Sequence, residues 1–194
     1  MTMKPHISNV IRCSAFQLRN ISRIRKYLSR DATEQLIHSF ITSRLDNNNA
    51  LLYGLPANEL YRLQKIQNTA ARILTFSKRS YHITPILKGL HWLPVAQRIV
   101  FKILLIVYKC INNVAPSYLS ELLSNYVPTR TLRSGQMQLL QETISKRSWG
   151  DRSFAIAAPR LWNELPIHIK TAKTVTIFKK LLKTHLMSET FCNN

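Results

Sequence analysis

The sequence has little glycine and little cysteine, and each shortage excludes a class of protein. Only four of the 194 residues are glycine, and no glycine-rich loop of the kind that cradles nucleotide phosphates is present. Cys13, Cys110 and Cys192 lie far apart and form no CxxC pair, so neither a disulfide scaffold nor a cysteine zinc site is expected. The six histidines form no HExxH motif, and we expect no bound metal and no other cofactor.

Acidic residues are also scarce, which excludes polymerase and nuclease chemistry. Such chemistry holds two divalent metals between clustered carboxylates, but the nine acids include no DD, DxD or ExD pattern. The serines and histidines lie in no GxSxG-like context. We therefore expect no catalytic residues and no enzyme activity from the isolated chain.

Positive charge is the strongest feature that the sequence does have. The chain carries 28 Lys and Arg against 9 Asp and Glu, which gives a formal net charge of +19 and a pI near 10.4. Charge of one sign repels itself unless an anion is bound. Nucleic acid, an anionic membrane surface or an acidic protein are candidate partners. We favour nucleic acid because the charge is spread through apolar helices instead of forming a polybasic tail.

Two alternatives involve membranes. The stretch at 86–109 is rich in aliphatic residues, but its apolar run between Lys102 and Lys109 is short, whereas a membrane span needs about 20 residues. No transmembrane segment is expected. Residues 1–30 contain no acid and read as a basic amphipathic helix, which is typical of mitochondrial transit peptides. A mitochondrial location therefore stays open beside a nuclear or cytoplasmic one.

Hydrophobic periodicity predicts a mostly α-helical fold. We expect two subdomains that meet near 127–135, a stretch with turn-forming residues, and a short strand at 138–145. Asp31 with Glu34 is the expected cap of the second helix, and Thr174 that of the last. The second helix is expected to bury Leu36, Ile37, Phe40 and Ile41. The expected helices are 7–28, 32–45, 57–75, 84–89, 94–112, 115–123, 151–162 (interrupted by Pro159) and 174–187.

Cations gather on single faces of these helices. At about 100° per residue, the first helix places Arg12, Arg19, Arg23 and Lys26 together, opposite a packing face of Val10, Ile21, Ile24 and Leu28. Solvated faces usually mix signs, whereas faces of one sign suit a surface that tracks phosphates. A merely solvated face remains the alternative. The expected nucleic-acid-binding residues are Arg12, Arg19, Arg23, Lys26, Arg62, Lys65, Arg72, Arg98 and Lys102.

A series of motifs occurs in a familiar order along the chain. The motifs are LLYGLP (51–56), RLQKIQNTAARIL (62–74), HITPILKGLHWLPVAQRI (82–99), FKILLIVYK (101–109), APSYLSELL (115–123), RTLRSG (130–135) and GDRSFAIAAPRLWNELP (150–166). Over residues 7–191 the chain closely resembles the carboxyl-terminal end of the polyproteins of non-LTR retrotransposons of the LINE type. In that family this region follows the reverse transcriptase palm and begins about where the helical thumb begins.

The resemblance implies a fold, a domain organisation and a function. A helical thumb-like bundle at 1–80 is expected to hold template and primer, followed by a helical extension at 81–128 and a smaller helical C-terminal subdomain at 129–194. The partners would be the RNA or DNA backbone and the upstream reverse transcriptase domains, whose palm carries the metal-binding aspartates. An alternative is the expressed end of a dead element without a selected function.

Two details bear on that alternative and on the core. Asn47 and Asn48 stand where the family usually has an aromatic and a small residue, so an apolar contact would be lost if these positions were buried. Trp92 and Trp162 are each followed by a proline that starts a helix, and we interpret them as core anchors rather than stacking platforms. The role of Trp149 stays open.

Overall fold

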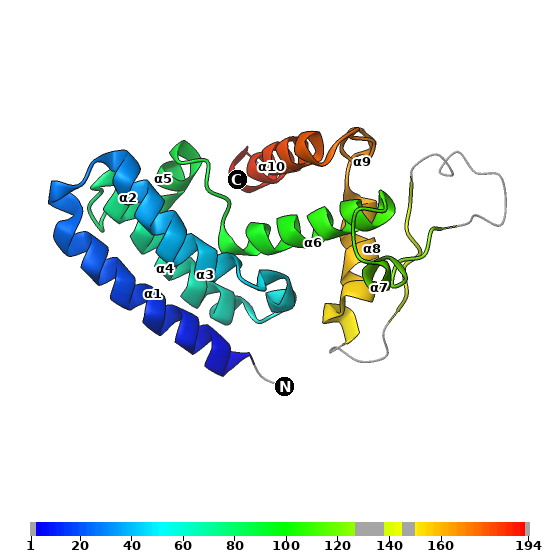
Figure 1. Ribbon diagram of the computed structural model, residues 1–194, viewed down its shortest axis with the longest axis horizontal. Helices are drawn as coiled ribbons and strands as arrows, with labels where there is room; N and C mark the ends of the chain where they lie inside the picture. The colour runs from blue at the N-terminus through cyan, green and yellow to red at the C-terminus, as the bar shows by residue number, and fades with distance from the viewer. Residues whose placement is uncertain (1–2, 127–137, 145–149, 193–194) are drawn as a thin grey trace. The chain divides into compact units, whose positions relative to one another are not determined.

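The computed structural model describes residues 3–126, 138–144 and 150–192, and the protein is mostly helical, as the sequence predicts (Figure 1). The chain forms two compact units, one of residues 1–99 with 187–194 and the other of residues 100–186. The units divide inside helices α6 (Val95–Ile111) and α10 (Val175–Cys192). The boundary predicted at 127–135 lies outside the described residues.

The first unit is built around two long helices, α1 and α4. α1 packs against α2, α3 and α4, and α4 also packs against α5 (Figure 1). The predicted third helix, 57–75, is confirmed at both ends by α4. The elements are α1 (Lys4–Ile24), the 3-10 turn η1 (Arg25–Tyr27), α2 (Arg30–Ile37), the π-helical turn η2 (His38–Thr42), α3 (Ser43–Asp46), the 3-10 turn η3 (Asn49–Leu52), α4 (Ala57–Thr75), α5 (Ile83–Gly89) and the start of α6 (Val95–Ile111).

The first helix ends earlier than predicted. α1 stops at Ile24 and continues as the η1 turn, so the predicted end near Leu28 is wrong. Of the predicted packing face, Ile21 is buried but Ile24 is 46% exposed, while Ile7 and Leu18 are buried as well. The tighter 3-10 turn changes the direction of the side chains that follow. As a result Arg25 is buried at this point instead of Ile24.

The second helix also differs from its prediction. Its cap is Ser29, whose Oγ accepts a hydrogen bond from the Ala32 amide at 3.1 Å, and not Asp31. Ile37 and Ile41 are buried, whereas Phe40 is 41% exposed. Because a π-helical turn takes more residues than an α-helical one, η2 shifts the phase of the apolar face at this point.

Asn47 and Asn48 are both exposed, so their polarity costs no buried apolar contact here. Asn48 has a φ of 53°, in the left-handed region that asparagine tolerates better than most residues. The two residues therefore fit the turn between α3 and η3, and the expected destabilisation by an apolar loss does not apply.

The second unit has an aromatic core. The rings of Tyr108 and Phe178 stack with centroids 4.1 Å apart, and Trp162, fully buried, lies 6.1 Å from Phe178. Trp162 and, in the first unit, Trp92 are buried as predicted for core anchors, while Trp149 lies outside the described residues. The elements are the end of α6, α7 (Ser117–Ser120), the 3-10 turn η5 (Gly150–Arg152), α8 (Phe154–Glu164, which continues through Pro159), α9 (Ile167–Lys170) and the start of α10 (Val175–Cys192).

The segment at 138–144 forms a single antiparallel bridge, between Leu140 and Asn125, in place of the predicted strand. The Asn163 side chain of α8 completes the pairing, because it accepts from the Leu140 amide and donates to the Leu140 carbonyl, each at 2.9 Å. The predicted Thr174 cap of α10 is confirmed, since its Oγ1 accepts from the Ile177 amide at 3.2 Å.

Lys170 gives the second unit a pH-dependent stability. The residue is buried, and its Nζ donates to the Asn163 carbonyl at 3.1 Å. Burial lowers the pKa of Lys170 below its ordinary 10.5, because desolvation disfavours the charged form. Between the lowered pKa and 10.5 the unfolded chain binds more protons than the folded one, so the free energy of unfolding rises with pH in that window.

Urea unfolding of wild type and Lys170→Met measures this effect. As pH rises from about 7 to about 10, the free energy of unfolding of wild type should increase relative to that of Lys170→Met. Lys173→Met, which replaces an exposed lysine nearby, is the matched control. A difference between wild type and Lys170→Met that does not change with pH would contradict the prediction.

Candidate nucleic-acid interface

An open groove of about 1060 Å³ runs along the first unit, lined by the end of α1, the η1 turn, α4 and the loop that follows α4. We call it the basic groove. Among the described residues that line it, none is Asp or Glu. Seven of them are cations: Arg23, Arg25, Lys26, Lys65, Arg72, Lys78 and Arg79.

The end of α4 turns the chain so that its last cations join the groove. Phe76 follows the helix with a φ of 53°, and the amides of Phe76 and Ser77 both donate to the Arg72 carbonyl, the latter at 3.1 Å. Such a left-handed residue ends a helix and lets its final carbonyls find donors. Lys78 and Arg79 follow immediately and are both exposed.

Arg25 is a buried cation, and each of its three guanidinium nitrogens donates to a backbone carbonyl. Only 6% of it is exposed, and it donates to the carbonyls of Leu28 at 2.9 Å, Ile73 at 3.2 Å and Leu74 at 3.1 Å. Two of these carbonyls belong to the last turn of α4, where a helix carries partial negative charge. Arg25 therefore fixes the η1 turn to the end of α4 and adds positive charge to the groove.

The other groove cations differ in how many contacts they make within the protein and in how exposed they are. Arg72 donates from Nη2 to the Tyr81 carbonyl at 3.1 Å, and its buried Nε has no partner among the described residues. Lys65 places Nζ 4.7 Å from the centre of the Tyr61 ring. Arg23, Lys26, Lys78 and Arg79 are exposed to solvent. Electrostatically, the groove suits a ligand with several negative charges in a row.

The structure brings four of the nine predicted binding residues into this groove, namely Arg23, Lys26, Lys65 and Arg72. Arg12 and Arg19 are exposed on α1 but do not line the groove. The face that carries them is the one that does not pack, as the helical spacing indicates.

Arg62 is occupied by contacts within the first unit. Its Nη1 lies 2.8 Å from the Glu59 carboxylate, and its Nη2 donates to the Ser8 hydroxyl of α1 at 3.1 Å. A cation neutralised by an adjacent acid adds little to the attraction of an anion. Arg62 is therefore better explained as a link between α4 and α1 than as a phosphate contact.

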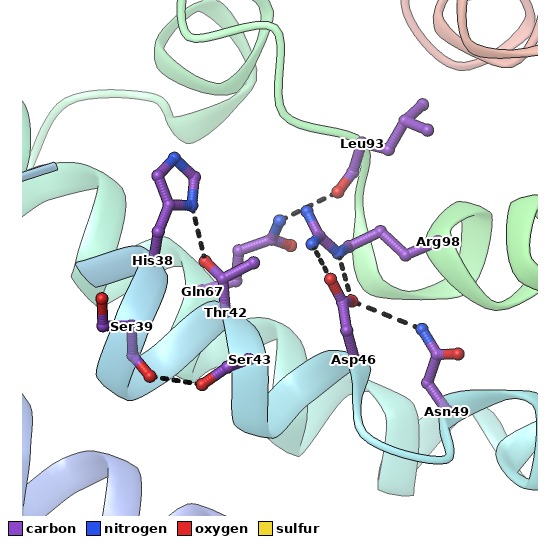
Figure 2. Close-up of polar contacts among 9 residues, drawn as sticks. All are labelled: His38, Ser39, Thr42, Ser43, Asp46, Asn49, Gln67, Leu93 and Arg98. Carbon is purple, nitrogen blue, oxygen red and sulfur yellow. Dashed lines mark hydrogen bonds and ion pairs between the residues drawn. The ribbon is translucent and has the colours of Figure 1, made fainter. Parts of the chain in front are cut away.

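Arg98 is likewise held in an ion pair, as Figure 2 shows. Its Nε donates to Asp46 at 2.8 Å and its Nη2 makes a second bond to the same carboxylate. Nearby, the Gln67 amide donates to the Leu93 carbonyl at 2.9 Å. These contacts attach the start of α6 to α3 and α4. Lys102, the ninth predicted residue, is exposed on α6 in the second unit and does not line the groove.

Three groove cations were missed by the sequence analysis: Arg25, Lys78 and Arg79. A helical wheel places Arg25 off the cationic stripe, but the wheel no longer applies once α1 ends at Ile24. Lys78 and Arg79 lie in what the sequence shows only as a polar link. The signal that could have found them is a basic pair directly after a helix, where cations favour the carbonyl end.

Comparisons with known proteins gave no matching family model, no similar curated protein and no similar solved structure. No helix in the described part of the chain has the length and the apolar character that a membrane crossing requires. Within residues 3–126, 138–144 and 150–192, no group of three or more His, Cys, Asp or Glu side chains could hold a metal ion.

Proposed function

We propose that the protein binds the phosphate backbone of nucleic acid in the basic groove. The observation that carries the proposal is the lining of that groove, where the described part of the chain contributes seven cations and no acid. Each phosphate that a Lys or Arg neutralises releases condensed counterions, and this entropic gain does not depend on base sequence. The expected mode is therefore attachment to the backbone without recognition of a sequence.

The finer proposal is that the chain is the non-catalytic, thumb-like end of a retrotransposon reverse transcriptase polyprotein, holding template and primer. Its support is the order of the sequence motifs, together with a helical first unit that gathers cations from α1 and α4 in one groove. The upstream palm would supply the catalytic carboxylates. A relic without selected function would retain the same motifs, so binding has to be measured.

The test is a salt titration of binding to a labelled mixed-sequence DNA duplex, followed by fluorescence anisotropy. Six of the seven groove cations are left to contact a ligand directly, because Arg25 is buried and its three guanidinium nitrogens donate to backbone carbonyls. If four to six of them meet phosphates, the logarithm of the association constant should fall with a slope of about −4 to −5 against the logarithm of salt. Absence of binding at low salt to the duplex and to single-stranded DNA, or a slope near −1, would overturn the proposal.

A further inference from the structure

Two exposed aromatic residues line the basic groove. Tyr61 is 57% exposed and Phe76 is 66% exposed, and both belong to the lining together with the cations. Large aromatic side chains usually bury most of their surface in a folded protein. Neither ring is buried in the core of the first unit, and each keeps more than half of its surface exposed in the groove.

Phe76 occupies a position that favours another residue type. Its φ of 53° is in the left-handed region, which glycine or asparagine normally supplies at the end of a helix. The Arg25 guanidinium lies 4.0 Å from the centre of its ring. This contact uses one face of the ring, and the exposed fraction shows that much of the remaining surface is open to a ligand.

Tyr61 repeats the arrangement near the other end of α4. Lys65 Nζ lies 4.7 Å from the centre of its ring, and more than half of the residue remains exposed. At about 1.5 Å per residue along a helix, the two aromatic positions are separated by about 20 Å. A single strand with a rise of about 3.4 Å covers that length with about six nucleotides.

We infer that the basic groove takes single-stranded nucleic acid and stacks unpaired bases on Tyr61 and Phe76, while its cations hold the phosphates between them. This inference rests on the proposed function and adds the kind of strand that is bound. Cations beside exposed rings are what a single strand requires, because every unpaired base offers a π-face and every linkage a phosphate. In a duplex the base faces are covered by their neighbours.

The experiment compares two oligonucleotides of about twelve nucleotides that carry the same number of phosphates. One is oligo(dT) and the other is its abasic counterpart, and binding of each is measured by competition against a labelled strand. Base stacking should make wild type bind oligo(dT) at least about 10-fold more tightly than the abasic strand, since each stacked base contributes about 5- to 150-fold. The affinity for oligo(rU), measured in the same way, shows whether the groove binds RNA or DNA more tightly.

A double variant, Tyr61→Leu with Phe76→Leu, tests the two rings. It should lose the preference for oligo(dT) over the abasic strand and keep the affinity for the abasic strand, which depends on the cations alone. Tyr61→Phe with Phe76→Tyr, which retains both rings, should keep the preference. Tyr118→Leu is the matched control, because Tyr118 is 64% exposed on α7 and does not line the groove.

The outcomes separate this inference from the proposed function. Equal affinity of wild type for oligo(dT) and the abasic strand, with duplex binding retained, would overturn the stacking inference alone. Absence of binding to the duplex and to both strands would overturn the proposed function as well. Because wild type alone distinguishes these results, a folding defect in the double variant does not remove the test.

Discussion

Changing Lys65, Lys78 and Arg79 together to Gln should weaken binding to a mixed-sequence duplex by roughly 100- to 1,000-fold at about 0.1 M salt. The three residues line the basic groove from α4 and from the loop after it. Each phosphate contact contributes about 0.9 to the salt slope, so loss of three should flatten it by about 2.7. Between about 1 M and about 0.1 M salt, a slope smaller by about 2.7 lowers the association constant by about 2.7 log units, which is the expected loss of affinity.

A control of equal charge is available on α10. Lys179→Gln, Lys180→Gln and Lys183→Gln also remove three exposed cations, but these residues do not line the groove. This variant should change the salt slope much less than the groove variant does. Equal slopes for the two variants would show that net charge, and not the groove, determines binding.

A further comparison tests the cationic stripe that the sequence predicts on the first helix. Changing Arg12, Arg19, Arg23 and Lys26 to Gln should weaken binding no more than changing Arg23 and Lys26 alone, because only these two line the groove. A much larger loss in the fourfold variant would indicate that the nucleic acid continues along α1 beyond the groove. Circular dichroism of each variant confirms that the helices are retained.

Much of the helical fold could be predicted from the sequence, because apolar spacing and proline starts are local signals. α4 begins directly after Pro56 and ends at Thr75, as its periodicity and flanking residues indicate. The errors come from changes in helix type. The turn at Arg25–Tyr27 and the π-helical turn at His38–Thr42 alter the number of residues per turn, and no simple periodic pattern signals that change.

The candidate site could be predicted only in part, for a related reason. Helical spacing finds cations that share one helix, such as Arg23 with Arg19, but the basic groove is made between elements distant in sequence. Whether a cation is free also depends on tertiary partners: Asp46, 52 residues from Arg98, neutralises it. The sequence shows how many acids there are, and the fold decides which cations they pair with.

Arg25→Met should lower the free energy of unfolding by about 2 to 4 kcal/mol, because three carbonyls lose a charged donor at once. The carbonyls of Ile73 and Leu74 lie in the last turn of α4, and the carbonyl of Leu28 directly follows η1. The methionine fills part of the space but donates nothing, and the Phe76 ring loses its cation. The effect should appear as a lower midpoint in urea unfolding, with an unchanged dependence on urea concentration.

Two variants separate the effect of the planar Arg25 guanidinium on stability from the effects of its charge and its position. Arg23→Met removes an exposed cation from the last turn of α1 and should change stability by no more than about 0.5 kcal/mol. Arg25→Lys keeps the charge but offers a single ammonium in place of a planar fork, so its stability should fall between those of wild type and Arg25→Met. If Arg25→Met is as stable as Arg23→Met, the three hydrogen bonds do not hold the η1 turn against α4. The groove wall would then need another support, because Arg25 joins the two elements that bring Lys26 and Lys78 to the same surface.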